Sequence, residues 1–143
     1  MKLELKHLAP YLPYGLKFIH QGHEYLLMQL NILYDQKPLQ VNGWSDQQQT
    51  LVDVFLEGCE PILHPLSDLL KQTKGFDYLI QIVDETDQQC DAYYHWCDAY
   101  IDNPDQSRIL QAPYEVFEIL VKKHFDVFGL IPQGLAVDMH SPK

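Results

Sequence analysis

The spacing of apolar residues changes along this chain from every second position to every third or fourth. In the stretch 26–34 the even positions are Leu, Met, Leu, Ile and Tyr, and residues 50–58 alternate in a similar way. A period of two is typical of half-buried strands, whereas the spacing after residue 87 is helical. The sequence therefore predicts an α+β fold, with a curved antiparallel sheet in the N-terminal half packed by two amphipathic C-terminal helices.

Short polar segments predict the turns of this sheet. Gln21-Gly22 separates two apolar runs and predicts a tight turn, and Asn42-Gly43 has the composition of a type I′ hairpin turn. The polar stretch 45–50, SDQQQT, has the composition of a loop. We expect a meander of about four antiparallel strands in the first 60 residues.

The C-terminal half predicts helices with one strand among them. Residues 61–75 predict a short helix, because Pro65 suits a first helical turn and Gly75 can end it. Residues 76–85 predict a strand, and residues 87–102 and 114–127 predict two amphipathic helices.

The end of the second helix contains a histidine with a structural role. His124 falls in the apolar arc near the predicted C-terminus of the helix, and Asp126 lies about 200° away from it, at 100° per residue. The two side chains therefore diverge and form no catalytic pair within the helix. Gly129 is predicted to be the left-handed residue after the helix, and residues 135–139 to form a final short strand.

Length and cysteine content favour one intracellular domain. A chain of 143 residues with 46% hydrophobic residues is long enough to bury a core, so we expect a single domain over residues 1–143. The three cysteines include no CxxC pair, which favours a reducing cytoplasm over a disulfide framework. No apolar run reaches the ~20 residues of a membrane span, and the first 15 residues do not resemble a signal peptide.

The charge balance restricts the class of partner. Ten basic and twenty acidic residues give a formal net charge of −10. Nonspecific nucleic-acid binding and binding to anionic membranes both need a basic surface. Both are therefore disfavoured, and the expected partners are basic protein surfaces, cations or small molecules.

The acidic residues concentrate in one segment. Residues 84–105 contain seven carboxylates and no Lys or Arg. On the helix predicted over 87–102, the acidic positions lie away from the apolar arc. We predict that this face binds a partner through Asp87, Asp91, Tyr94, His95, Trp96, Asp98 and Asp102. An ordinary solvated helix face explains the same pattern without any partner.

Other chemistry offers alternatives. Asp87, Asp91 and His95 are spaced by four residues and Asp98 follows His95 by three, so neighbouring side chains can meet around a divalent metal ion. The alternative function is a metal-dependent enzyme or a small-ligand-binding protein that uses His95 and the neighbouring aspartates. His20 and His23 flank the first predicted turn and form a second candidate pair of metal ligands. The chain has no HExxH, P-loop, GxGxxG or GxSxG motif, so no catalytic residue and no cofactor is predicted. A homo-oligomeric structural component is a further alternative.

The cysteines lie in acidic surroundings. Cys90 and Cys97 fall on the apolar side of the acidic helix, and Cys59 lies close to Glu57 and Glu60. Burial and nearby carboxylates both raise the pKa of a thiol, so none of the three is predicted to be a nucleophile.

Three segments resemble a family of small proteins from phages and prophages of gut anaerobic bacteria. The segments are LAPYLPYGLK (8–17), PILHPLSDL (61–69) and HFDVFGLIPQGLAVD (124–138). They come from the start, the middle and the end, so the resemblance spans the chain, although the acidic helix matches least. The family tends to carry Arg where His64 stands. The resemblance implies a phage or mobile-element setting and no particular activity, and we expect a non-enzymatic accessory protein.

Overall fold

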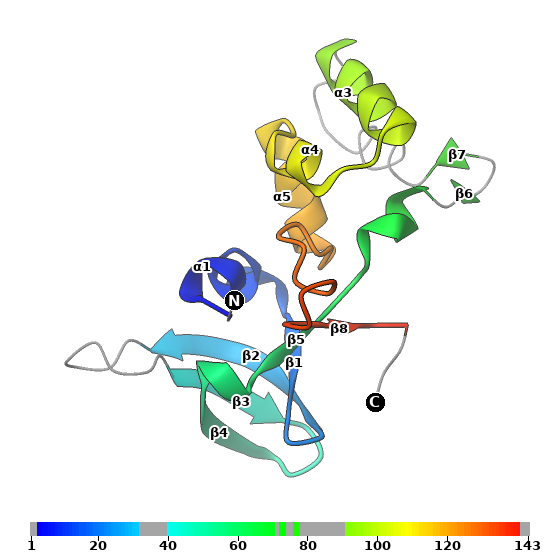
Figure 1. Ribbon diagram of the computed structural model, residues 1–143. Coiled ribbons are helices and arrows are strands. Elements are labelled where there is room, and N and C mark those ends of the chain that lie inside the picture. The colour runs from blue at the N-terminus through cyan, green and yellow to red at the C-terminus, as the bar shows by residue number, and fades with distance from the viewer. Residues whose placement is uncertain (1–2, 32–39, 71, 74–75, 78–90, 141–143) are drawn as a thin grey trace. The chain divides into compact units, whose positions relative to one another are not determined.

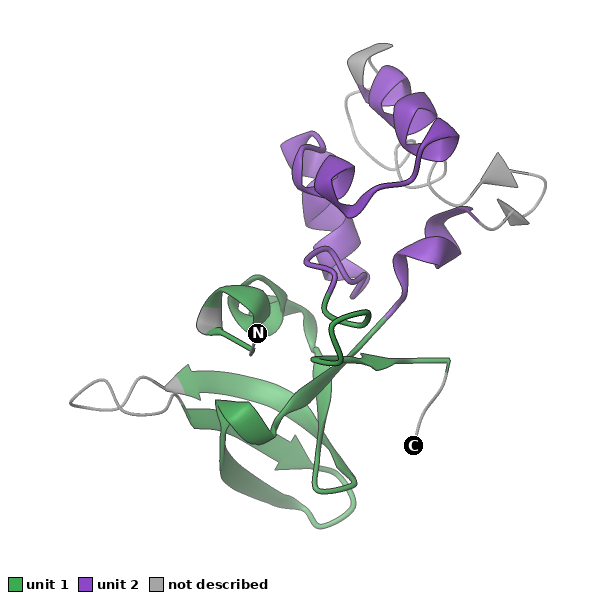
Figure 2. Ribbon diagram, in the orientation of Figure 1, with its two compact units in different colours: residues 1–63, 130–143 green, residues 64–129 purple. Residues whose placement is uncertain are grey.

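The computed structural model describes residues 3–31, 40–70, 72–73, 76–77 and 91–140 (Figure 1). The chain divides into two compact units (Figure 2): unit 1 comprises residues 1–63 and 130–143, and unit 2 comprises residues 64–129. Unit 1 contains a mostly antiparallel open sheet, and unit 2 contains the longer helices, so the predicted α+β class is confirmed. The single domain expected over residues 1–143 stays a prediction.

The sheet of unit 1 contains three consecutive hairpins, formed by β1 to β4, to which β5 and β8 are added beside β1. Its strand order is β4-β3-β2-β1-β5-β8, and neighbouring strands are antiparallel except β5 and β8, which are parallel. The strands are β1 (Lys17–His20), β2 (His23–Asn31), β3 (Gln40–Ser45), β4 (Thr50–Phe55), β5 (Glu60–Leu63) and β8 (Val137–Asp138). The predicted meander of the first 60 residues is confirmed, and β8 lies within the predicted final strand.

Short helical turns precede the first strand of this sheet and connect β4 to β5. The helix α1 (Leu5–Leu8) continues into the 3-10 helix η1 (Ala9–Tyr14), and η3 (Leu56–Gly58) joins β4 to β5. Tyr11 and Leu16 are fully buried. The carbonyl of Leu16 accepts a hydrogen bond from the amide of Leu27 at 2.8 Å, which ties the N-terminal segment to β2.

The first predicted turn is confirmed. Gln21 and Gly22 join β1 to β2 with φ values of 50° and 81°. Positive φ at both central residues is the requirement of a type I′ turn, whose twist matches that of the flanking strands. His20 and His23 are register partners on either side of the turn.

The second predicted turn is wrong. Asn42 and Gly43 lie inside β3, and the chain reverses at residues 46–49, within the stretch predicted to be a loop. A Cβ on Gly43 would lie 2.6 Å from Cζ of Phe18 and 2.9 Å from Cβ of Tyr25. The absence of a side chain at Gly43 therefore allows Phe18 and Tyr25 to approach the backbone of β3 closely. Close approach of this kind is one reason for a glycine inside a strand.

The helix predicted over 61–75 is wrong in its first part. Residues 60–63 form β5, and only after Pro65 does the 3-10 helix η4 (Leu66–Leu70) begin. In unit 2, the amide of His64 donates to the carbonyl of His124 at 2.8 Å, and the amide of Asp126 donates to the carbonyl of His64 at 2.9 Å. Backbone pairing with a distant segment therefore overrides the local helical preference at this position.

Unit 2 contains two short strands and, besides η4, three α-helices among its described residues. The strands β6 (Gln72–Thr73) and β7 (Phe76–Asp77) pair antiparallel, so the strand predicted over 76–85 is described only at its start. The helices are α3 (Asp91–Asp102), α4 (Gln106–Leu110) and α5 (Tyr114–Lys122). The helix predicted over 87–102 is confirmed from Asp91 onward, and residues 87–90 lie outside the described residues.

Helix α5 ends at Lys122, before the predicted end at Val127. The amide of His124 donates to the carbonyl of Val121, and the amide of Phe125 to that of Leu120, both at 2.9 Å. With φ of 65° at His124, this is a Schellman motif, in which glycine is the usual left-handed residue.

The prediction that Gly129 is the left-handed residue that ends α5 is therefore wrong. Gly129 does have a φ of 69°, but its amide donates to the carbonyl of Asp126 at 3.2 Å and closes a later turn.

Candidate functional site

The acidic residues of α3 lie together on one side of the helix. His95, Asp98 and Asp102 are exposed, and at 100° per residue they fall within about 60° of one another. We call these three residues the acidic face of α3. Asp91 is the first residue of the helix, and Asp87 lies outside the described residues.

The aromatic residues of α3 make contacts inside unit 2. The hydroxyl of Tyr93 donates to Oε2 of Glu115 in α5 at 2.6 Å. Nε1 of Trp96 donates to the carbonyl of Arg108 in α4 at 2.9 Å, and the Trp96 ring stacks on Tyr100 with centroids 5.8 Å apart. Trp96, which the sequence predicts to be a partner-binding residue, therefore also anchors α3 to its neighbours.

The hydrogen bond from Tyr93 has an electrostatic consequence for α5. It lowers the pKa of the Glu115 carboxyl, because the hydroxyl donates to the ionised form. Glu115 also lies in the first turn of α5, where a negative charge interacts favourably with the helix dipole. The contact between α3 and α5 is therefore stabilised when this carboxylate is ionised.

The carboxylates of Asp98 and Asp102 form no ion pair with any residue that the structure describes. Burial raises the pKa of Tyr100, and the negative charge of Asp105 raises it further. Tyr94, the other aromatic residue predicted to contact a partner, is half-buried.

The histidine pair at the first turn is positioned as the register predicts. His20 and His23 face each other across β1 and β2. Nδ1 of His20 lies 2.9 Å from the carbonyl oxygen of Gly58, and because a carbonyl only accepts, this nitrogen carries the proton. Only Nε2 of His20 is left to ligate a metal ion. The pair supplies at most two protein ligands, fewer than the three or four typical of a zinc site.

A second histidine contact was not predicted from the sequence. In unit 2, Nδ1 of His64 lies 3.2 Å from Oδ2 of Asp68, and the His64 ring stacks on Phe125 with centroids 5.0 Å apart. In the sequence, only the spacing of four residues between His64 and Asp68 indicates that their side chains can meet. The backbone pairing of His64 with Phe125, which positions the ring, connects segments far apart in the sequence.

Both described cysteines are buried. Burial raises the pKa of the Cys59 thiol to about 12, and its Sγ donates to the carbonyl of Phe55 at 3.5 Å. Cys97 is 1% exposed. A protonated, buried thiol is a poor nucleophile. The expectation that Cys59 is unreactive is therefore supported, and Cys90 lies outside the described residues.

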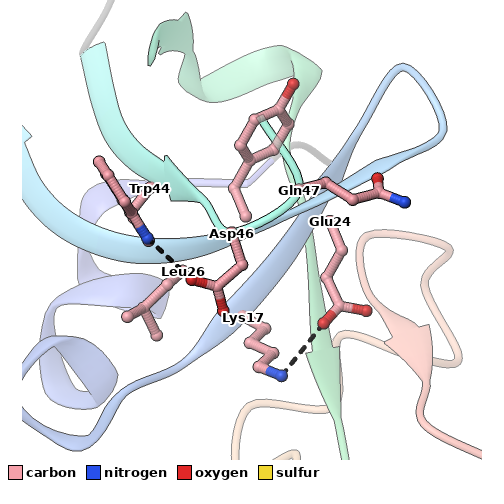
Figure 3. Close-up of a pocket in the computed structure, with 7 residues that line it drawn as sticks. Lys17, Glu24, Leu26, Trp44, Asp46 and Gln47 are labelled. Carbon is pink, nitrogen blue, oxygen red and sulfur yellow. Dashed lines mark hydrogen bonds and ion pairs between the residues drawn. The ribbon is translucent and has the colours of Figure 1, made fainter. Parts of the chain in front are cut away.

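A groove on the sheet of unit 1 is a second candidate surface, which the sequence did not indicate (Figure 3). It has a volume of about 300 Å³. Its lining residues are Lys17, Glu24, Tyr25, Leu26, Trp44, Asp46 and Gln47. Nε1 of Trp44 donates to Oδ1 of Asp46 at 2.9 Å, and Nζ of Lys17 lies 3.2 Å from Oε1 of Glu24. These two contacts hold the polar side chains at the rim of the groove.

The strand register explains why Lys17, Leu26 and Trp44 share one face of the sheet. Lys17, Leu26, Trp44 and Leu51 are successive register partners across β1, β2, β3 and β4. Directly opposite residues of an antiparallel pair project to the same side of the sheet. The row is therefore charged at β1 and apolar at β4, where the Leu51 side chain is 55% exposed. We call this side the outer face of the sheet.

Comparisons with known proteins identify no relative. The chain matches no protein-family model, no curated protein and no solved structure. None of the helices in the described part of the chain has the length and apolar character required to cross a membrane. The function is therefore argued from the surfaces described above.

Proposed function

We propose that the protein is a non-enzymatic binding protein, which recognises a basic protein partner through the acidic face of α3. The observation that carries this proposal is the placement of Asp98 and Asp102. Both side chains are exposed, and among the described residues neither has a cationic partner. Like charges on one helix face repel each other, so a cationic partner lowers their energy.

The helix dipole supports the same class of partner. Asp102 lies in the last turn of α3, which contains no basic residue. This end of a helix carries partial negative charge, so a carboxylate here is unfavourable by about 0.3–1 kcal/mol. A Lys or Arg of a partner would interact favourably both with the carboxylate and with the last carbonyl groups of the helix.

The anchoring of α3 also favours a docking role. The hydrogen bonds of Tyr93 and Trp96 attach the helix to α5 and α4. A docking surface that is ordered before binding loses less conformational entropy when the partner binds. The resemblance to phage and prophage proteins suggests the setting, which is that of an accessory protein of a mobile element.

Partner capture with matched charge variants tests the proposal. Tagged protein would be incubated with nuclease-treated lysate of the source cells, and captured proteins would be identified by mass spectrometry. The variant Asp98→Lys/Asp102→Lys reverses the acidic face. The control Glu57→Lys/Glu118→Lys makes the same change in net charge at exposed positions outside α3.

The expected result is a stoichiometric basic protein that the wild type and the control retain and the α3 variant loses, with equal melting temperatures for all three. Equal capture by all three proteins would show that the acidic face is only solvated. Capture of no protein would also contradict the proposal.

A further inference from the structure

Strand β4 forms one edge of the sheet in unit 1. Among the described residues it pairs only with β3, and the whole strand Thr50–Phe55 takes part in that pairing. The backbone groups of β4 that point away from β3 therefore lie along an edge of the sheet. Such an edge is a template for pairing with another extended chain.

The sequence of β4 carries little of the usual protection of an edge strand. Natural edges are protected by charged side chains, especially Lys, by Pro, by a bulge, by very short strands or by a covering segment, and the one charged residue of β4 is Asp53. The strand reads TLVDVF, without Lys or Pro, and its register with β3 is uninterrupted. The register shift of this sheet lies between Leu27 and Gln29 in β2, and the opposite edge strand, β8, has only two residues. Strand β4 is thus the longer and more regular of the two edges.

The outer face of β4 has an apolar–acidic–apolar pattern. Leu51 and Phe55 are 55% and 53% exposed, and Asp53 lies between them on the same face. Nδ2 of Asn42 donates to Oδ1 of Asp53 at 2.9 Å, which positions the carboxylate in the fourth register pair from the turn. Residues two apart on a strand are separated by about 7 Å, so a paired strand would present one side chain to each of these three residues.

We propose that β4 is a docking edge for an extended segment of a basic partner protein, which adds to the sheet as an antiparallel strand. The segment carries Lys or Arg opposite Asp53 and apolar side chains opposite Leu51 and Phe55. Main-chain hydrogen bonds supply affinity in strand addition, and alternate side chains supply specificity. An opposite-charge pair directly across two strands is favourable.

The register argues against a second copy of the chain at this edge. A two-fold pairing of β4 with itself that keeps the outer faces continuous can place Leu51 opposite Phe55 of the other copy. The same register places Asp53 opposite Asp53, and like charges directly opposite each other destabilise a sheet. Shifting the register by two residues separates the aspartates but leaves an apolar side chain opposite a carboxylate. A basic segment fits the edge without either penalty.

Peptides of defined charge test the proposal. The probes are a fluorescein-labelled peptide, Thr-Val-Thr-Lys-Thr-Val-Thr, and a matched peptide with Glu in place of Lys, measured by fluorescence anisotropy. The wild type is expected to bind the Lys peptide about fivefold to tenfold more tightly than the Glu peptide. Asp53→Lys is expected to reverse this order, whereas the control Glu118→Lys, which makes the same charge change at an exposed position of α5, preserves it.

Two further measurements keep the test decisive. Asp53→Asn retains a side chain that can bond to Asn42 and removes the charge, so both peptides should bind it equally well even if Asp53→Lys fails to fold. Hydrogen exchange of the β4 amides should slow when the Lys peptide binds, which a contact through side chains alone would not cause.

Equal binding of both peptides to the wild type, or binding of neither at millimolar concentration, would overturn the proposal. A dimer that Phe55→Lys disrupts would also overturn it, because a second copy would then occupy the edge. The proposal is independent of α3: Asp98→Lys/Asp102→Lys should bind the Lys peptide like the wild type, so the two proposals fail separately.

Discussion

The ring of Phe18 lies so close to the backbone of Gly43 that a Cβ at position 43 would be 2.6 Å from Cζ of Phe18. Phe18 is 1% exposed and stacks on Tyr25 with centroids 5.5 Å apart, so the ring has little room to move. Three neighbouring strands, β1, β2 and β3, therefore contribute to one close contact in unit 1.

Replacement of Gly43 is expected to destabilise the sheet. Gly43→Ala forces the buried Phe18 ring and the backbone apart, and overpacking of this kind costs about 1–3 kcal/mol of unfolding free energy. Urea unfolding followed by tryptophan fluorescence measures the loss. In the double variant Gly43→Ala/Phe18→Leu the loss should be smaller than the sum of the two single losses, because the smaller side chain relieves the contact. A Gly43→Ala protein that unfolds at the wild-type urea concentration would contradict this account of the glycine.

The same contact shows how far the sequence predicts the fold. Alternation within residues 50–58 and helical spacing within residues 91–102 are local properties, and they predicted a strand and a helix at these places. The strand ends at Phe55, and residues 56–58 form η3 instead. The role of Gly43 depends on Phe18 in another strand, so its Asn-Gly dipeptide was misinterpreted as a turn. The early end of α5 has a related cause, since the residue after His124 pairs with His64, far away in the sequence.

The candidate surfaces also differ in whether they depend on local sequence or on contacts between distant segments. The acidic face of α3 was predictable because His95, Asp98 and Asp102 belong to one helix, whose periodicity alone brings them together. The groove beside Trp44 and the edge formed by β4 were not predictable, because each depends on which strands pair and in which register. The resembling segments 61–69 and 124–138 are also joined in the structure, by the parallel pairing of β5 with β8 in unit 1.

The left-handed conformation of His124 predicts an unusual order of stabilities. His124→Gly is expected to be more stable than His124→Ala by about 1 kcal/mol, because only glycine adopts positive φ without strain. Both variants remove the imidazole, so the difference between their stabilities measures only the cost of positive φ at position 124. At the preceding residue, Lys123, φ is −91°, and there the Ala variant should be the more stable one. Thermal unfolding of the four variants measures both differences; equal stability of the two His124 variants would contradict the Schellman assignment.

The buried thiol of Cys59 predicts a change of stability at high pH. Burial raises its pKa from 9.0 to about 12, so the folded state favours the protonated thiol. The stability that depends on this group is complete below pH 9 and is lost as the pH rises toward 12. The unfolding free energy of the wild type should therefore fall more steeply over this interval than that of Cys59→Ala.

Alkylation provides an independent check on Cys59. Iodoacetamide at pH 8, followed by mass spectrometry, should modify this residue only when the protein is unfolded in urea, because a buried protonated thiol reacts slowly. Modification of the folded protein at the rate of a free cysteine would contradict the assigned environment.

Trp96 allows the structural and the docking roles of α3 to be separated. Trp96→Phe retains a ring to stack on Tyr100 but removes the hydrogen bond to the carbonyl of Arg108. That carbonyl still accepts a hydrogen bond from the amide of Gln111 at 3.2 Å, so the loss of the indole hydrogen bond alone is expected to cost about 0.5–1.5 kcal/mol, measured by urea unfolding. His95→Ala, on the exposed side of the same helix, should change stability by less than about 0.5 kcal/mol. If Trp96→Phe instead matched the wild type in stability and lost the captured basic partner, Trp96 would be a docking residue, as its position beside the acidic residues in the sequence predicts.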